Sequence, residues 1–120
     1  MKKSYEEYEG ISSTFWWIFI ESAKSRNIEV KIDIKFLWNL YLKQDKKCAL
    51  SGLPLILDKF GVKKEILKEG VYFASLDRIN NKLAYCENNV RWLAREINLM
   101  KWKLTDEEFL FFCKNVSKNS

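Results

Sequence analysis

The sequence predicts a small α+β protein. Two stretches near the N-terminus repeat apolar residues with a helical period, and a third helix-forming stretch lies near the C-terminus. Between them lie short apolar pieces, separated by turn residues, that are typical of strands. The chain of 120 residues is long enough for one domain with a real core, and its 48% hydrophobic and 31% charged content is typical of a folded, soluble protein. We therefore expect a single domain over residues 1–120.

The N-terminal part, about residues 10–45, is expected to be helical. Apolar residues recur with helical spacing from Ile11 to about Ser25, and Ser12 or Ser13 is available as the N-cap. After a short alternating stretch over residues 27–32, Asp33 can cap a second helix that ends near Gln44. We expect both helices to pack apolar faces against the rest of the domain.

Residues 46–104 are expected to hold the strands. Gly52 and Pro54 mark a tight turn, and the lysine-rich residues 58–70 predict an exposed excursion. Residues 71–79 then predict a strand and residues 89–101 a helix, in the order strand, loop, short strand, helix. Finally, Thr105 and Glu108 have capping-box spacing, which predicts a last helix over about residues 105–117.

The positive charge is concentrated in the middle of the chain. Residues 31–104 carry 15 basic and 8 acidic side chains, a surplus of seven, whereas the two ends are nearly neutral. Such a distribution favours a polyanionic partner, nucleic acid before a membrane. The longest apolar run, residues 15–20, is far shorter than the roughly 20 residues that cross a bilayer. No apolar signal region follows Met1, so we expect a cytoplasmic protein.

The three cysteines, Cys48, Cys86 and Cys113, are widely spaced and form no C-x-x-C motif. Their odd number and spacing predict neither a disulfide framework nor a four-ligand zinc site. We expect all three to be buried thiols.

Polar side chains that could do chemistry gather near the end of the predicted strand. Asp77 and Arg78 stand there side by side. The predicted helix adds further groups on two adjoining faces: Asn98 with Lys101, and Arg91 with Arg95. Carboxylate and amide oxygens suit Mg²⁺, and a guanidinium suits a phosphate. The alternative is an exposed ion pair beside a surface amide, and spacing alone does not decide between the two.

The string "CALSGLPL … ASLDRINNKLAYCENNVRWLAREINLMKWKLTDEEFLFFC" resembles the HNH, or ββα-metal, nucleases. The resemblance is to the phage- and mobile-element-associated branch, which carries Asp-Arg where most members carry Asp-His, and it covers about residues 10–116. It implies a ββα-metal (HNH/His-Me finger-like) core over residues 46–104, with N-terminal helices and a C-terminal helix over residues 105–117.

The resemblance also implies a site and an activity. Asp77 and Asn98 match the metal ligands of the family, and Asn89 matches the central Asn that holds the strand–helix loop in shape. The implied function is a metal-dependent DNA endonuclease that hydrolyses phosphodiester bonds with one ion, Mg²⁺ or Mn²⁺. Contacts to the DNA backbone are expected from five basic residues: Arg78, Arg91, Arg95, Lys101 and Lys103.

The chain departs from the family at the general base. Arg78 stands where most members have a histidine, and the sequence contains no histidine. Arginine cannot accept a proton near neutral pH, because its pKa lies above 12. Either another group activates water, or water activated by the ion attacks while Arg78 clamps the scissile phosphate, or the site is inactive. Tyr85 and Tyr72 are possible bases if a cation lowers their pKa from about 10.

A second departure concerns zinc. Some relatives brace the fold with two C-x-x-C pairs, whereas here the first pair reads Cys48 and Ser51 and the helix positions read Ala94 and Ile97. One thiol cannot make a structural zinc site, so we expect packing around Trp92 and the terminal helix to replace it.

Two other hypotheses compete with the DNA endonuclease. One is a catalytically inactive DNA-binding module of the same fold, and the other is a nuclease acting on RNA or branched nucleic acid. A homodimer would be needed to cut both strands symmetrically, but no segment of the sequence marks an interface.

Overall fold

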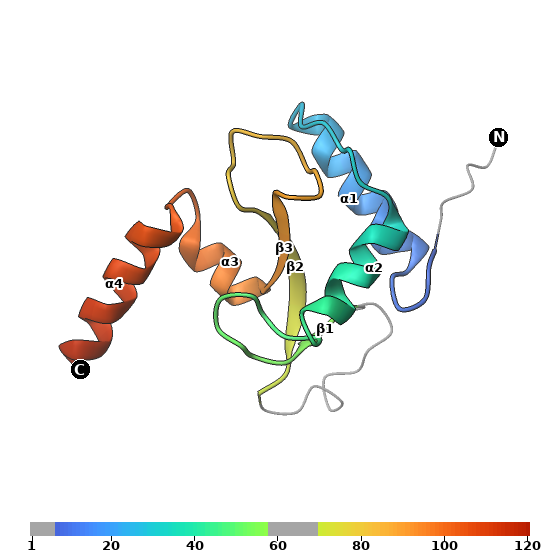
Figure 1. Cartoon of the computed structure of the whole chain (residues 1–120). Helices are drawn as coiled ribbons and strands as arrows, with labels where there is room; N and C mark the ends of the chain where they lie inside the picture. Colours follow the sequence, from blue (N-terminus) through green and yellow to red (C-terminus); the bar gives the residue numbers. More distant parts are fainter. Residues whose placement is uncertain (1–6, 58–69) are drawn as a thin grey trace.

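The computed structural model describes residues 7–57 and 70–120. Within them, four helices and three strands form an α+β fold, as the sequence predicts (Figure 1). In chain order the elements are α1 (Ser13–Ser25), α2 (Ile34–Lys43), β1 (Leu55–Ile56), β2 (Tyr72–Arg78), β3 (Val90–Ala94), α3 (Arg95–Lys101) and α4 (Asp106–Lys118). The excursion expected over residues 58–70 lies almost wholly outside the described residues.

The two N-terminal helices begin where their capping residues predict. The Ser12 side chain accepts a hydrogen bond from the backbone N–H of Phe15, and the Asp33 carboxylate accepts one from that of Phe36. Each cap satisfies a backbone donor that the first helical turn leaves without a partner. Both predicted helices are therefore confirmed, with α2 ending before Gln44.

The sheet has the strand order β1-β2-β3, with β1 parallel and β3 antiparallel to β2. The helix predicted over residues 89–101 is wrong in its first half, because residues 90–94 form β3 and α3 begins only at Arg95. Pairing with β2 and burial of Trp92 and Leu93 outweigh local helical spacing here. As a result, Arg91 and Arg95 lie on different elements rather than on one helix face.

The core is built around β3. Trp92 and Leu93 are completely buried, and the indole N–H of Trp92 donates to the carbonyl of Leu37 in α2 at 3.0 Å. The ring of Phe15 from α1 lies 5.6 Å from the Trp92 ring, measured between centroids. The expected packing around Trp92 is therefore present. Of the three thiols only Cys48 is buried, and the prediction is wrong for Cys86 and Cys113, which are partly exposed.

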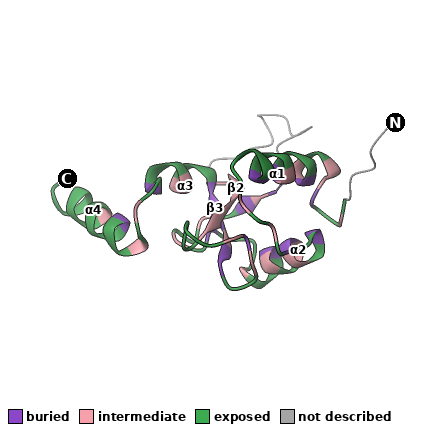
Figure 2. Ribbon diagram, turned by 90° about the horizontal axis from the view of Figure 1, so that it is seen from above, coloured by how far each residue is buried: buried purple, intermediate pink, exposed green. Residues whose placement is uncertain are grey.

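Helix α4 stands apart from this core. Thr105 and Glu108 form the predicted capping box, with both reciprocal hydrogen bonds present. However, Phe109 is the only buried residue of α4, and most of the helix is exposed where it extends from the body (Figure 2). The expectation that the terminal helix braces the core is therefore wrong: Phe109 lies outside the core cluster, and Asp106 joins α4 to the body through Arg91 and Lys101. None of the described helices has the length and apolar character needed to cross a bilayer.

Candidate functional site at the end of β2

Strand β2 presents the sequence-predicted residues on two opposite faces. Side chains alternate along a strand, so Ser75 and Asp77 share one face while Leu76 and Arg78 share the other. Helix α3 contacts the first face, where the Asn98 amide donates to the Ser75 hydroxyl at 2.9 Å. Asp77 and Asn98 are therefore both neighbours of Ser75 on one face of β2, and Arg78 points away from them.

Asp77 belongs to a network of four charged side chains that joins β2, β3, α3 and α4. Arg91, directly opposite on β3, donates from Nε to Asp77 Oδ2 at 2.9 Å. The two Nη atoms of Arg91 donate to the Asp106 carboxylate at 2.7 and 2.6 Å, and Lys101 Nζ lies 3.6 Å from Asp106. The side chains of Asp77 and Arg91 are each only 11% exposed. Two acids and two bases thus compensate one another inside the molecule.

The network shifts the pKa of two of its members. The hydrogen bond from Arg91 is the main reason that the pKa of Asp106 lies below its ordinary value. Burial acts to lower the pKa of Arg91, but the hydrogen bonds to Asp106 and Asp77 outweigh it and the pKa is raised. Each group is therefore held more firmly in its charged form.

This face carries two oxygen atoms of a kind that hard divalent cations bind, but the described residues contain no group of three or more His, Cys, Asp or Glu side chains that could hold a metal ion. Arg91 engages only Oδ2 of Asp77, and Asn98 donates through its nitrogen, so a carboxylate oxygen and an amide oxygen are free of hydrogen bonds among the described residues. Mg²⁺ prefers such oxygen ligands, completed by water. The guanidinium of Arg91 already balances part of the Asp77 charge, however, which weakens the affinity that this pair of residues can offer.

Arg78 and Tyr85 lie together on the other side of β2. Arg78 Nη1 donates to the Leu83 carbonyl at 2.8 Å, and its guanidinium lies 5.4 Å from the centre of the Tyr85 ring. Tyr85 is buried against Phe19, and its hydroxyl accepts a hydrogen bond at 3.0 Å from Arg26, the residue that follows α1. The hydroxyl of Tyr85 thus lies beside a cation, on the face of β2 opposite to Asp77.

The second candidate base is distant from Asp77. Tyr72 is the first residue of β2 and lies opposite Leu55 of β1. Five residues of extended strand separate it from Asp77, a span of roughly 16 Å. The fold does not bring these two side chains together.

Asn89 holds the loop between β2 and β3. It is 4% exposed, accepts from the backbone N–H of Asn80 at 2.8 Å, and donates to the carbonyls of Asn80 and Ala84, each at 2.9 Å. Three hydrogen bonds from one buried amide tie both ends of residues 80–89 together. Asn89 therefore fixes the conformation of the loop between β2 and β3.

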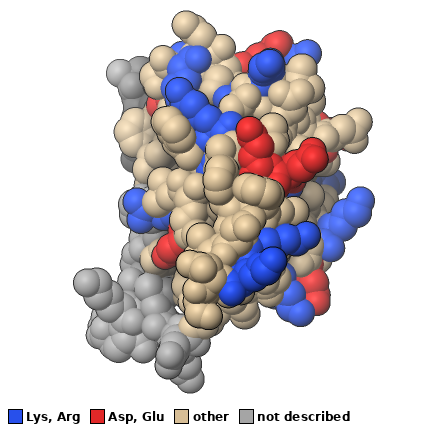
Figure 3. Space-filling model, turned by 90° about the vertical axis from the view of Figure 1, so that its left-hand side faces the viewer, with Lys and Arg blue, Asp and Glu red and all other residues tan. Residues whose placement is uncertain are grey.

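The five cations expected at DNA differ in their exposure. Arg95 and Lys103 are exposed, and Arg78 is partly exposed. Arg91 and Lys101 instead lie in the buried network, a placement that favours a structural role for them. Viewed from the α4 side, the surface carries separate groups of basic and acidic side chains rather than one continuous basic stripe (Figure 3).

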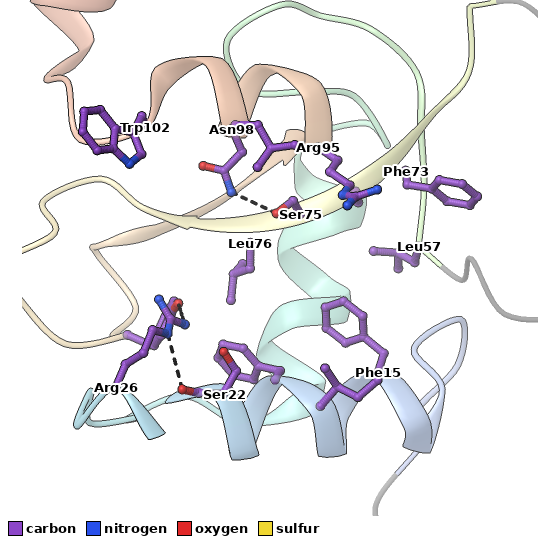
Figure 4. Close-up of a pocket in the computed structure, with 15 residues that line it drawn as sticks. Phe15, Ser22, Arg26, Leu57, Phe73, Ser75, Leu76, Arg95, Asn98 and Trp102 are labelled. Carbon is purple, nitrogen blue, oxygen red and sulfur yellow. Dashed lines mark hydrogen bonds between the residues drawn. The ribbon is translucent and has the colours of Figure 1, made fainter. Parts of the chain in front are cut away.

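A pocket of about 420 Å³ lies between α1 and α3, beside β2. Asn98, Arg95 and Trp102 line it from the α3 side, while Arg26 and Ser22 line it from the α1 side (Figure 4). The sequence did not point to Arg26, because residues 1–30 carry no surplus of positive charge and the contact with Tyr85 spans 59 positions. The sequence did not predict an exposed position for Trp102 either, since its exposure depends on the turn between α3 and α4.

Comparisons of the chain with protein-family models, with curated proteins and with solved structures give no match. The functional argument therefore depends on the residues and their geometry.

Proposed function

We propose that the chain is a metal-dependent endonuclease that hydrolyses DNA phosphodiester bonds, with β2, β3 and α3 forming a ββα-metal core. The observation that carries this proposal is the position of Asp77 and Asn98, which both neighbour Ser75 on one face of β2. The loop held by Asn89 supports it, because that loop fixes the end of the strand that carries Asp77 and Arg78. The resemblance of the sequence to HNH nucleases is the reason that these residues are assigned to a metal site.

In this proposal Asp77 and Asn98 hold Mg²⁺ or Mn²⁺ through their side-chain oxygens. A bound divalent ion supplies electrostatic stabilisation of the charge that develops on the phosphate and on the leaving oxygen. Arg78 approaches from the other side of the strand end, where the Leu83 carbonyl orients its guanidinium to receive a phosphate. Its permanent charge makes Arg78 a phosphate ligand rather than a proton acceptor.

The test is nicking of supercoiled plasmid by the full chain with Mg²⁺, Mn²⁺ or EDTA, beside Asp77→Asn and Asn98→Ala. We expect metal-dependent nicking that falls at least a hundredfold in each variant. Asp45→Asn is the matched control, since Asp45 is an exposed acid that forms an ion pair with Lys47 on the surface. Thermal melting monitors folding of each variant. Nicking that survives in EDTA, or equal activity of Asp77→Asn and the parent, would refute the assignment.

A second candidate is a catalytically inactive DNA-binding module of the same fold. The ion pair between Asp77 and Arg91 favours it, because it occupies the proposed metal ligand, and so does the lack of any histidine. This candidate predicts DNA binding that is the same with Mg²⁺ and with EDTA, and no nicking with either metal. A binding titration run beside the nicking assay separates the two functions.

A further inference from the structure

We propose that the pocket between α1 and α3 binds an unpaired nucleotide, so that the preferred partner is single-stranded rather than fully paired DNA. The proposal deepens the function proposed above and rests on it for the choice of nucleic acid. It starts from three independent features of the pocket: its charge, its aromatic rim and the open edge of β2.

Among residues 7–57 and 70–120, the charged side chains that line the pocket are both basic. They are Arg26 and Arg95, and both are exposed. Arg26 is held in place, because its Nε donates to the Ser22 carbonyl at 3.3 Å and its Nη2 to Tyr85. The two guanidiniums lie on opposite sides, one just after α1 and one on α3 (Figure 4). A strand that passes between the helices would meet one arginine on each side, which suits successive phosphates.

The rim carries a tryptophan whose placement the fold does not favour. Trp102 is 74% exposed, and its backbone has φ +49° and ψ −118°. A bulky side chain rarely adopts positive φ, and glycine is the usual residue where a helix ends in this way. Lys103 adds a cation 5.1 Å from the centre of the Trp102 ring. A large exposed ring kept at a strained position beside a basic pocket is the arrangement expected for stacking on a base.

The floor of the pocket includes an edge of β2 that has no strand partner among the residues that the structure describes. Just beyond the paired strands, the backbone N–H of Ile79 donates to the carbonyl of Asn89, and hydrogen-bonded residues alternate along an antiparallel pair. The N–H and C=O of Leu76 therefore point away from β3, and β1 ends beside Phe73 before reaching it. These groups can pair with the edge of a base that is not already paired. Stacking and edge pairing are open to an unpaired base but not to a base inside a duplex.

The experiment measures fluorescence anisotropy of a labelled 12-nucleotide thymidine oligomer and of a blunt 12-base-pair duplex, both in EDTA. We expect the full chain to bind the single strand at least tenfold more tightly. Trp102→Gly should weaken single-strand binding at least tenfold while the melting temperature stays at or above that of the parent. The double variant Arg26→Gln/Arg95→Gln should weaken it further and reduce the salt dependence.

The matched controls lie on α4, away from the pocket: Phe111→Ala removes another exposed ring, and Lys114→Gln another exposed cation. Equal affinity for duplex and single strand would overturn the proposal, as would unchanged binding by Trp102→Gly. Binding of an extended acidic peptide without binding of the oligomer would assign the open edge to a peptide strand and also overturn it. Because EDTA prevents metal-dependent cleavage, binding is measured separately from activity. Single-strand binding in EDTA together with no plasmid nicking in Mg²⁺ or Mn²⁺ would refute the nuclease and leave the nucleotide pocket standing.

Discussion

The β2–β3 hairpin has two outer edges, one on each strand, and they differ in whether their backbone groups are hydrogen-bonded. On β3, the side chain of Gln44 donates to the carbonyl of Trp92 and accepts from its N–H, and Ala49 N–H donates to the same carbonyl. On β2, Leu76 and Arg78 lie beyond the end of β1 and have no strand partner on that side among the described residues. A closed edge stabilises the fold, whereas an open edge between two helices keeps backbone groups available for a ligand.

The largest expected effect is a loss of stability when a buried side chain of β3 is removed. Trp92→Ala removes a completely buried indole and its hydrogen bond to Leu37, and we expect it to lower the free energy of unfolding by about 3–5 kcal/mol. Chemical denaturation measures this loss. Leu110→Ala on the exposed part of α4 should change stability by less than about 0.5 kcal/mol. Comparable losses in the two variants would contradict the contrast between core and α4.

A smaller effect is expected from the side chain that closes the edge. Gln44→Ala leaves the N–H of Trp92 without its acceptor and should cost about 1–3 kcal/mol. Gln44→Glu keeps the acceptor and removes the donor, whose carbonyl partner still bonds to Ala49, so it should cost less. The order of the two variants in urea melts tests the pairing, and a costlier Gln44→Glu would argue against it.

The network of Asp77, Arg91, Lys101 and Asp106 should affect how the stability of the protein depends on pH. The pKa of Asp106 is lowered by folding, so its contribution to stability is complete above the ordinary value of 3.8 and disappears as the pH falls through the lower, folded value. Asp106→Asn should therefore destabilise the protein modestly at pH 7 and make its stability less sensitive to acid below pH 4. Denaturation at several pH values measures how the free energy of unfolding of the parent and of Asp106→Asn changes with pH. An identical pH dependence in the two proteins would exclude this contribution.

The smallest expected effect is a difference in amide protection between alternate residues of β2, and it can be measured without a mutation. Hydrogen exchange should alternate along β2, with the amides of Ser75 and Asp77 protected by β3 and those of Leu76 and Arg78 exchanging quickly. Amide-resolved exchange measured by NMR checks this pattern. Uniform protection along the strand would mean that the edge is closed. Added single-stranded oligomer should slow exchange at Leu76 if the pocket holds a nucleotide.

Local signals in the sequence were sufficient for most helices and for β2. Ser12, Asp33 and Thr105 act within their own first turns, so their caps can be predicted from neighbouring residues alone. The boundary between β3 and α3 could not be found in this way, because pairing with β2 decides it. The short β1 also depends on a partner, which lies beyond residues 58–69 in the chain.

In the candidate site too, features set by neighbouring residues could be predicted, whereas features set by distant partners could not. Asp77, Asn89 and Asn98 could be singled out from motif and resemblance, and the contacts of Asn89 follow from its own loop. The charged partners of these residues could not be predicted. Arg91 binds Asp77 from the opposite strand, and it also binds Asp106, which belongs to a later helix. Whether Arg91 binds phosphate or a carboxylate depends on which face of β3 it occupies, and no periodicity of the sequence gives that face.

The forked side chain of Arg91 joins the proposed catalytic centre to α4, because it holds Asp77 with one nitrogen and Asp106 with the other two. Two equilibria that share a counter-ion are thermodynamically coupled, and the coupling is reciprocal. If Asp77 binds a divalent ion as proposed, an ion that draws Asp77 away from Arg91 changes the docking free energy of α4. Docking of α4 then changes the affinity for the ion by the same amount, so the terminal helix and the proposed site would regulate each other.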